Sequence, residues 1–251
     1  MNALPKAVFA ERPTESVSEK YSFISSKQIV DKFLSSGFEI AKSGGVKGRV
    51  DPEHAKHFIT FTNPKVPNLI DPRINNGVGT PEVLVINSSD GKSAVQFALG
   101  IYAFICGNGL VVGTQYSGKR FKHMNLSYND IEAVISEFIS SPQKLQDDIY
   151  RFASRQLTQE EMQKIAAYSL ISKYGSVKGN VLSVLERRRE ADLGNDAWTV
   201  FNVIQENLVK GGYKLERRTV RQMAAHRAIN LTQKVWDIFE EEVFTGKTIN
   251  V

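Results

Sequence analysis

The spacing of apolar residues changes near Tyr128, and this change limits the fold more than any other feature of the sequence. Before it, short runs rich in β-branched and aromatic residues alternate with clusters of Gly, Pro, Asn and Asp, a pattern typical of strands. The runs are FEIA, HFITFTN, EVLVINS and FALGIYAFICGNGLVVG. After it, apolar residues recur every three or four positions, which is the spacing of one helical face. They include Ile131, Val134, Ile135 and Phe138.

One amphipathic helix is predicted before the first strand. Ser25 and Gln28 have the spacing of a capping box, and Gly37 supplies the usual stop signal. Most of the strand-like runs have no helix-length segment between them, so the crossovers that parallel strands require are hard to build. The sequence therefore predicts an antiparallel sheet with a flanking helix.

Start and stop signals define helices through the second half of the chain. Thr158 and Glu161 have capping-box spacing, and a later helix begins at Asn195 or Asp196. The two helices are predicted to end at glycines, namely Gly175 and Gly211. We therefore predict an α+β protein, with an α+β sheet module over residues 1–126 and a helical module over residues 127–251. A single continuous domain is the alternative.

Composition excludes several classes of protein. The 251 residues can bury a core of adequate size, and the ordinary content of charged residues argues against disorder. The single cysteine, Cys106, cannot form an internal disulfide or a tetrathiolate metal site. No segment has the apolar length of a membrane span, and the amino terminus lacks the pattern of a signal peptide. We expect a cytoplasmic protein, in the host cell if the source is viral, with no membrane partner.

Positive charge gathers in two segments, of which the first covers residues 116–128 and interleaves cations with aromatic rings. We call it the basic–aromatic stretch. Cations neutralise phosphates and exposed rings stack on bases, so the pattern is typical of single-strand binding. The predicted contacts are Tyr116, Lys119, Arg120, Lys122 and His123. The alternative is a structural strand with Phe121 in the core and the cations in solvent.

The second segment, which we call the basic segment, runs from Lys210 to Lys234 and holds seven cations against one anion. It lies between predicted helices and also contains Tyr213. Its predicted nucleic-acid contacts are Lys214, Arg217, Arg218, Arg221 and Arg227. A third cationic run, at residues 187–189, is flanked by acids, so we expect its charges to be paired internally. The flanking acids are Glu186, Glu190 and Asp192.

Residue patterns define no catalytic or cofactor site. Cys106 lies in a Gly- and Asn-rich turn, and its activation would need a nearby His or helix N-terminus that sequence does not place. His54 and His57 have a spacing that metal ligands use, but they precede a strand, where side chains three apart point to opposite faces. We therefore assign no catalytic residue, no metal and no cofactor, and an enzymatic role stays open.

Several motifs of the chain occur together in one family. The most specific are the NSSDG turn at Asn87–Gly91, the CGNGL run at Cys106–Leu110, and the NDAW and QEN motifs that begin at Asn195 and Gln205. With SEKYSFISSKQIVDKFLSSGFE and HAKHFITF, they make nearly the whole chain resemble a phage- and plasmid-borne family, domain of unknown function 932. The resemblance implies a mobile-element origin. It carries no established activity, so it transfers no catalytic residue.

Three functions are compatible with these features. The first is a non-catalytic nucleic-acid-binding protein of a phage or mobile element, which acts in DNA replication or recombination by binding or annealing single strands. Such a protein would favour single-stranded DNA and could form a homo-oligomer. The second is a phage protein that binds and inhibits a host defence or regulatory protein through its helical half. The third is a nucleic-acid-processing enzyme with an unrecognised site.

Overall fold

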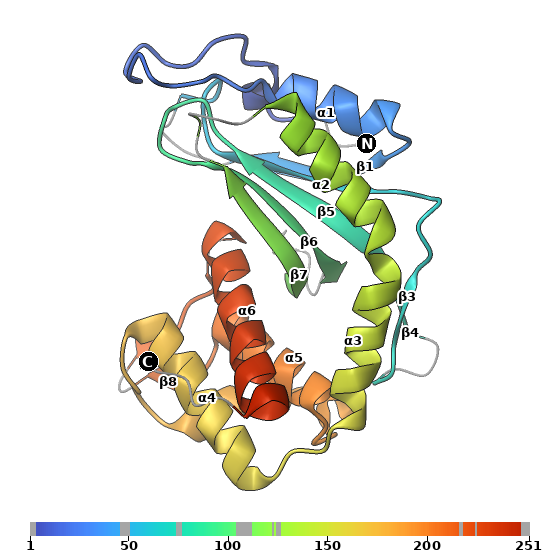
Figure 1. Cartoon of the computed structure of the whole chain (residues 1–251). Helices are drawn as coiled ribbons and strands as arrows, with labels where there is room; N and C mark the ends of the chain where they lie inside the picture. Colours follow the sequence, from blue (N-terminus) through green and yellow to red (C-terminus); the bar gives the residue numbers. More distant parts are fainter. Residues whose placement is uncertain are drawn as a thin grey trace. The chain divides into compact units, whose positions relative to one another are not determined.

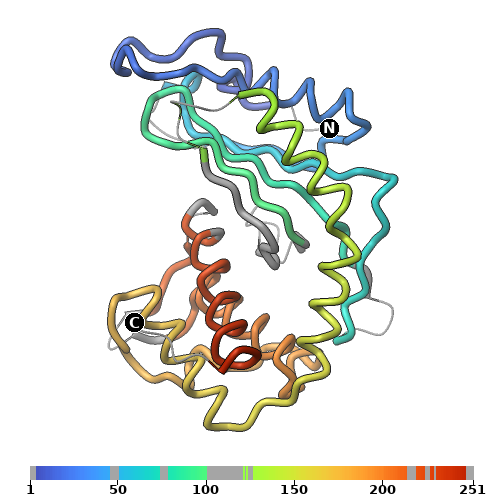
Figure 2. Tube along the Cα trace, viewed as in Figure 1, coloured from blue at the N-terminus to red at the C-terminus, as the bar shows by residue number. Residues whose placement is uncertain are grey.

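The computed structural model describes residues 4–45, 51–73, 77–103, 112–121, 123, 127–215, 218–223 and 225–246. At 77, 78, 101–103, 112–120, 214, 215, 218, 225, 226 and 229 it describes the backbone alone. The chain divides into two compact units (Figures 1 and 2). The first comprises Met1–Asn68, Thr80–Ile101 and Tyr116–Gln143, and the second comprises Leu69–Gly79, Tyr102–Gln115 and Lys144–Val251.

A sheet forms the centre of the first unit. Its strand order is β1 (Glu39–Gly45), β2 (His57–Thr62), β5 (Pro81–Asn87), β6 (Val95–Ala103) and β7 (Val112–Phe121). Strands β1, β2, β5 and β6 pair antiparallel with their neighbours; Thr60, for example, pairs with Leu84, and Val85 pairs with Phe97. The predicted antiparallel sheet is therefore confirmed.

Two helices, α1 (Ser26–Ser35) and α2 (Tyr128–Ser140), pack on this sheet (Figure 1). Alternate strand positions point to the same face, and their apolar side chains join those of both helices in one core. The 3-10 helix η1 (Lys6–Phe9) adds Val8 to it. The largest core side chains include Phe33, Phe61, Phe97 and Phe138. The predicted α+β class is confirmed by this unit together with the mainly helical second unit.

The Asn87–Gly91 turn binds the amino-terminal segment to the sheet. The buried Ser26 hydroxyl accepts a hydrogen bond from Asn87 Nδ2 at 2.8 Å and lies 2.8 Å from His57 Nε2. Beside them, the Tyr21 hydroxyl donates to the Ser88 carbonyl at 3.2 Å. These bonds satisfy polar groups that would otherwise be costly to bury. In the described structure, this motif therefore has a structural role.

Helix α5 (Ala197–Lys210) is the centre of the second unit, and most of its residues are buried. A helix buried on all sides must be largely apolar around its whole circumference, as AWTVFNVI is. Helices α4 (Gln159–Tyr174) and α6 (Ala225–Phe239) pack against it, with the short 3-10 helices η2 (Val181–Val184) and η3 (Glu190–Asp192).

Aromatic rings fill the space around α5. Phe152, on α3 (Pro142–Ser154), stacks on Trp236 of α6 with ring centroids 4.4 Å apart. The Phe201 ring meets the Trp236 ring edge-on at 5.3 Å, and Trp198 stacks on Phe201 at 5.9 Å. Both tryptophans are buried, so they are core residues of this unit.

Three small elements complete the second unit. A ribbon pairs β3 (Leu69–Asp71) with β4 (Gly77–Gly79), and a second ribbon pairs β8 (Lys214–Leu215) with β9 (Arg218–Thr219). A π-helical segment, η4 (Glu240–Thr245), continues from α6.

Most of the predicted helix ends are confirmed. Thr158 and Glu161 form their capping box, and Gly175 follows α4 with a φ of 75°. Asp196, rather than Asn195, caps α5 by accepting a hydrogen bond from the Thr199 amide at 2.9 Å. Gly211 follows α5, also at positive φ.

The capping box predicted at Ser25 and Gln28 is wrong. Ser25 is the N-cap residue of α1, but its side chain makes no capping hydrogen bond. Gln28 instead uses its Oε1 atom to accept a hydrogen bond from the Tyr128 hydroxyl, at the start of α2. A tertiary contact therefore takes the side chain that the local pattern assigned to the cap.

Candidate functional site

The carboxyl end of α5 is capped by several other parts of the second unit. The last carbonyl groups of a helix have no partner inside it and need one elsewhere. Here the Leu208 carbonyl accepts from Lys173 Nζ at 2.6 Å, and the Gly211 carbonyl accepts from Arg188 Nη2 at 2.6 Å. The Asn207 and Val209 carbonyls accept from the backbone amides of Gly211 at 2.9 Å and Met223 at 2.8 Å. Lysine and arginine suit this place because the helix dipole is negative there.

A hairpin leaves this helix end and carries the middle of the basic segment. Gly211 and Gly212 have φ values of 73° and 88°, which glycine adopts without strain. A Cβ atom on Gly211 would lie 2.4 Å from the Val220 carbonyl oxygen. The Gly212 amide donates to that oxygen at 2.9 Å, and the Val220 amide donates to the Tyr213 carbonyl at 2.9 Å. These two hydrogen bonds therefore hold the two sides of the hairpin together at the end next to α5.

Two of the predicted cations lie on this hairpin. In its ladder, Lys214 of β8 pairs with Thr219 of β9, and Leu215 pairs with Arg218. Residues 216 and 217, which connect the two strands, lie outside the described part of the chain, and so does the prediction for Arg217. The backbone therefore places Lys214 and Arg218 on neighbouring strands.

Lys173 and Tyr174, the last two residues of α4, hold the base of the hairpin. Lys173 Nζ donates to the Tyr213 hydroxyl at 3.0 Å, and that hydroxyl lies 2.6 Å from the Tyr174 hydroxyl. The Lys173 Nζ atom also lies 5.0 and 5.3 Å from the centroids of the two rings, within cation–π range. We call these three residues the lysine–tyrosine cluster.

Burial governs how the lysine–tyrosine cluster titrates. It lowers the pKa of Lys173 to about 8, because the charged amine loses water and no described carboxylate pairs with it. Burial also raises the pKa of Tyr174 and of Tyr213, and the bond to Tyr174 raises the pKa of Tyr213 further. An amine that loses its proton readily therefore lies beside two phenols that keep theirs.

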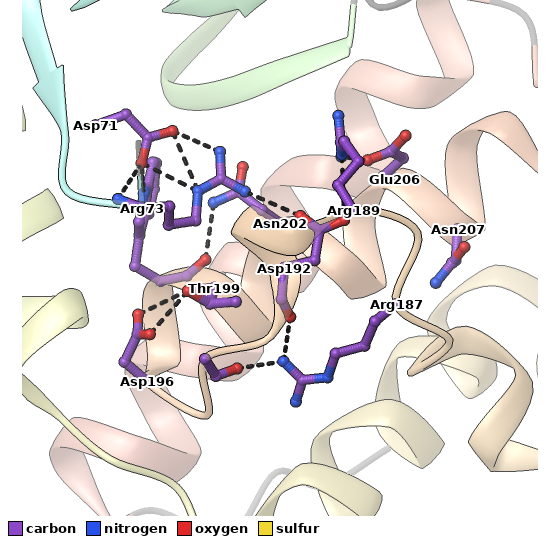
Figure 3. A network of polar contacts seen from close by, with 12 residues as sticks. Asp71, Arg73, Arg187, Arg189, Asp192, Asp196, Thr199, Asn202, Glu206 and Asn207 are labelled. Atoms are coloured by element: carbon purple, nitrogen blue, oxygen red, sulfur yellow. Dashed lines mark hydrogen bonds and ion pairs between the residues drawn. The ribbon is translucent and has the colours of Figure 1, made fainter. Parts of the chain in front are cut away.

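All three arginines at residues 187–189 form hydrogen bonds or ion pairs within the second unit. Arg189 pairs with Asp192 at 3.2 Å and also with Glu206 of α5 (Figure 3). Arg187 donates to the Asp192 and Gly194 carbonyls. Among the described contacts, Glu186 and Glu190 pair with none of the three arginines. The predicted pairing with flanking acids is therefore found for Arg189 with Asp192, whereas Arg187 and Arg188 bind backbone carbonyls instead, and the sequence missed Glu206.

Glu206 belongs to a wider network of buried charges (Figure 3). Lys210 binds the other Glu206 oxygen at 2.5 Å, so this cation of the basic segment is neutralised internally. Arg73 pairs with Asp71 at 2.5 Å and lies 3.8 Å from Asp192. Burial raises the pKa of Asp71, but the hydrogen bonds and charge of Arg73 outweigh it and hold that pKa below its usual range. In this network each carboxylate forms an ion pair with a cation, so little unpaired charge remains to bind a ligand.

Arg221 and Arg227 differ from these paired cations. Both are exposed, and neither forms an ion pair with another described residue. Between them in the sequence, the Met223 amide donates to the Val209 carbonyl, and the Met223 side chain packs on Val209 and Ala228. Two predicted contacts are therefore exposed cations that lie close in sequence to residues packed on α5.

The predicted contacts of the basic–aromatic stretch lie in the first unit. Tyr116, Lys119 and Arg120 are on β7, the last strand in the sheet order, where the structure describes the backbone alone. Lys122 lies outside the described residues. The Phe121 ring packs against the core, 5.9 Å from the Phe97 ring. The cations and Tyr116 stay predictions.

His123 is placed differently from the other predicted contacts. Its ring is buried and stacks on the Tyr21 ring at 4.6 Å, and its Nδ1 atom lies 3.3 Å from the Ser22 carbonyl oxygen. Burial lowers the pKa of His123, which disfavours the charged form that a phosphate would prefer. In this arrangement His123 acts as a packing residue.

The alternative sites from the sequence are also placed. His57 bonds to Ser26 and to the Ala55 carbonyl, whereas His54 bonds to Asp51 at 2.6 Å, so the two histidines serve separate contacts. In the part of the chain that the structure describes, no three His, Cys, Asp or Glu side chains are grouped to hold a metal. Cys106 lies outside that part. None of the described helices has both the length and the apolar character needed to cross a bilayer.

These features define an α+β protein with a sheet unit and a helical unit, in which a cation-bearing hairpin is fixed to the end of a buried helix. The chain belongs to the family domain of unknown function 932, whose model matches residues 13–236. It is similar to two proteins of Escherichia coli (strain K12), UPF0380 protein YfjQ and UPF0380 protein YafZ. Each is 29% identical over 210 residues, which cover 82% of this chain and 74% of the relative. No solved structure matches the chain.

Proposed function

We propose that this chain binds nucleic acid through the basic segment, with single-stranded DNA as the preferred partner, and that it acts in replication or recombination of a mobile element. One observation carries the proposal. Arg221 and Arg227 face solvent without an ion pair among the described residues, whereas nearby Lys210 is neutralised by Glu206. Part of the positive charge that the described fold leaves unmatched thus lies beside the hairpin.

The physical basis is the release of counterions from the phosphate backbone. Each cation that neutralises a phosphate of a single strand contributes roughly 0.7 to the slope of log affinity against log salt. Lys214 and Arg218 on the hairpin add to the charge of Arg221 and Arg227, with Arg217 between the two strands in the sequence. The strand pairing fixes the backbone of Lys214 relative to that of Arg218, so little ordering of these two positions would be needed on binding.

The basic–aromatic stretch supplies a second proposed contact. Lys119 and Arg120 would bind phosphates, and Tyr116 would stack on a base. All three lie on β7, the last strand in the sheet order.

Binding of the full chain to fluorescent oligonucleotides across a salt series tests the proposal. We expect binding to a 30-nucleotide poly-dT strand at low salt, a linear log–log decline with salt, and weaker binding to a duplex of equal length. The absence of binding to either oligonucleotide at low salt would end the proposal.

A host protein is a second candidate partner. Three large apolar side chains between α4 and α5 are well exposed, with Val177 at 48%, Leu182 at 51% and Leu193 at 66%. Exposed apolar residues in one segment suit a protein interface better than a nucleic-acid interface. Replacing the three with Ser should leave oligonucleotide binding unchanged if nucleic acid is the partner.

A further inference from the structure

Helix α4 carries two lysines in opposite surroundings. Lys164 forms an ion pair with Glu242 at 2.5 Å, and the hydrogen bond to that carboxylate raises the pKa of Lys164. Lys173, nine residues later, has no carboxylate partner among the described residues and lies between Tyr174 and Tyr213. The same helix therefore holds an ordinary charged lysine and an unusual one.

We propose that Lys173 is a site of covalent acylation, and that its substrate is an activated acyl donor of the acyl-phosphate or acyl-thioester class. Lys173 is a partly exposed residue, so a small donor can approach its side chain. Two neutral acceptors hold it, the Leu208 carbonyl and the Tyr213 hydroxyl, and neither accepts as strongly as a carboxylate. The position of Nζ is thus fixed by bonds that do not require the charged form.

The step is a nucleophilic acyl transfer. The lone pair of the unprotonated Nζ atom attacks the carbonyl carbon of the donor, and a C–N bond forms. The C–O bond to phosphate, or the C–S bond to the thiol, then breaks, and the leaving group departs with the electron pair. The nitrogen gives up one proton to water. Nothing is oxidised or reduced, so no further reactant is needed.

The surroundings of Lys173 supply the reactive form near neutral pH. With a pKa of about 8, about half of the amine is unprotonated at pH 8, against about 0.3% for a lysine at the ordinary value of 10.5. Burial is the cause of this shift, and no charged residue in the described part of the chain contributes to it. Among the described contacts, the titratable groups that meet Nζ are two phenols that keep their protons, Tyr174 and Tyr213.

Acylation of Lys173 would also change the hydrogen bonds that hold the base of the hairpin to α4 and α5. An amide nitrogen keeps one hydrogen, so the modified residue cannot donate to the Leu208 carbonyl and the Tyr213 hydroxyl together. The end of α5 or the base of the hairpin would lose a hydrogen bond. If the proposed function holds, this loosening would weaken nucleic-acid binding at a residue that touches no phosphate.

Acetyl phosphate and peptide mass spectrometry test the proposal, with Lys164 as a control within the same molecule. The full chain is exposed to acetyl phosphate between pH 7 and pH 10, and initial acetylation of each lysine is measured. We expect Lys173 to react roughly ten times faster than Lys164 at pH 8, because its larger neutral fraction outweighs its lower basicity. In 8 M urea the two rates should become equal. A Lys173 rate at or below that of Lys164 in the folded chain would overturn the proposal.

The pH profile gives an independent readout. The rate at Lys173 should level off above about pH 8, whereas the rate at Lys164 should continue to rise through pH 10. A Lys173 rate that rises in parallel with Lys164 over the whole range would also contradict the proposal. Neither readout involves an oligonucleotide, so failure here is distinct from failure of the proposed function.

Discussion

The Lys173 amine donates to the Tyr213 hydroxyl at 3.0 Å, and this bond joins the end of α4 to the base of the β8–β9 hairpin. The same amine caps the Leu208 carbonyl in the last turn of α5. One side chain therefore connects three elements at the base of the hairpin. The placement of the hairpin in the basic segment depends on how firmly this junction holds.

Removing the Tyr213 hydroxyl should weaken the second unit. In Tyr213→Phe, Lys173 and Tyr174 each lose a partly buried hydrogen-bond partner, and we expect the free energy of unfolding to fall by roughly 1–3 kcal/mol. Urea denaturation measures the change. Tyr150→Phe is the control, because Tyr150 is 45% exposed and its hydroxyl loss should change stability by less than about 0.5 kcal/mol. Equal effects in the two variants would show that the junction is weak.

Replacing Gly211 and Gly175 with Ala in separate variants tests how rigid the base of the hairpin is. Both follow a helix at positive φ, but a Cβ on Gly175 meets nothing within 4 Å, whereas one on Gly211 meets the Val220 carbonyl oxygen at 2.4 Å. Gly175→Ala should cost about 1–2 kcal/mol of unfolding free energy from conformation alone. Gly211→Ala should cost clearly more and shift the amide signals of residues 212–220 in NMR spectra. Similar costs would mean that the hairpin moves aside freely.

The buried His57 should make the protein sensitive to acid. Burial lowers the pKa of His57 in the folded state, so the unfolded chain binds the proton more tightly. The stability that the neutral ring contributes is therefore complete above the unfolded value of about 6.5 and is lost as the pH falls below it. His123, whose pKa burial also lowers, acts in the same direction.

Urea denaturation between pH 7.5 and pH 5 checks this prediction. We expect His57→Gln to be less stable than the parent at pH 7.5, because the Ser26 and Ala55 contacts change, but to lose less stability on acidification. His54→Gln is the control, since His54 bonds to Asp51 on the surface. If His57→Gln and the parent lose the same stability between the two pH values, the histidine does not titrate as described.

Local signals predicted the parts of this fold that depend on neighbouring residues. The glycines at 175 and 211 end their helices because positive φ is cheap for glycine, and Asp196 caps α5 because its carboxylate reaches the free amide of Thr199. The antiparallel sheet followed from the absence of helix-length connections. Such features need no knowledge of distant residues.

The candidate site depended on contacts that local patterns do not contain. Lys173 and Tyr213 are 40 positions apart, and Arg189 and Glu206 are 17 apart, so neither pair forms a recognisable motif. From the sequence, Gln28 was compatible with a capping box or with a tertiary contact. In the structure its side chain accepts a hydrogen bond from the Tyr128 hydroxyl instead of capping the helix. The sequence signalled α2 as a helix, but only its packing shows that its apolar face covers the sheet.

The salt dependence of single-strand binding by matched charge variants tests the proposed function most directly. One variant combines Arg221→Ala with Arg227→Ala, and the control combines Lys65→Ala with Lys178→Ala, which removes the same charge from exposed positions outside the basic segment. Fluorescence anisotropy with poly-dT between 20 and 300 mM salt gives each slope. We predict that the arginine variant binds more weakly and that its slope is smaller by about 1.4, from two lost phosphate contacts, while the lysine variant keeps the parent slope. Identical slopes for both variants, or a larger loss in the lysine variant, would contradict nucleic-acid binding through the basic segment.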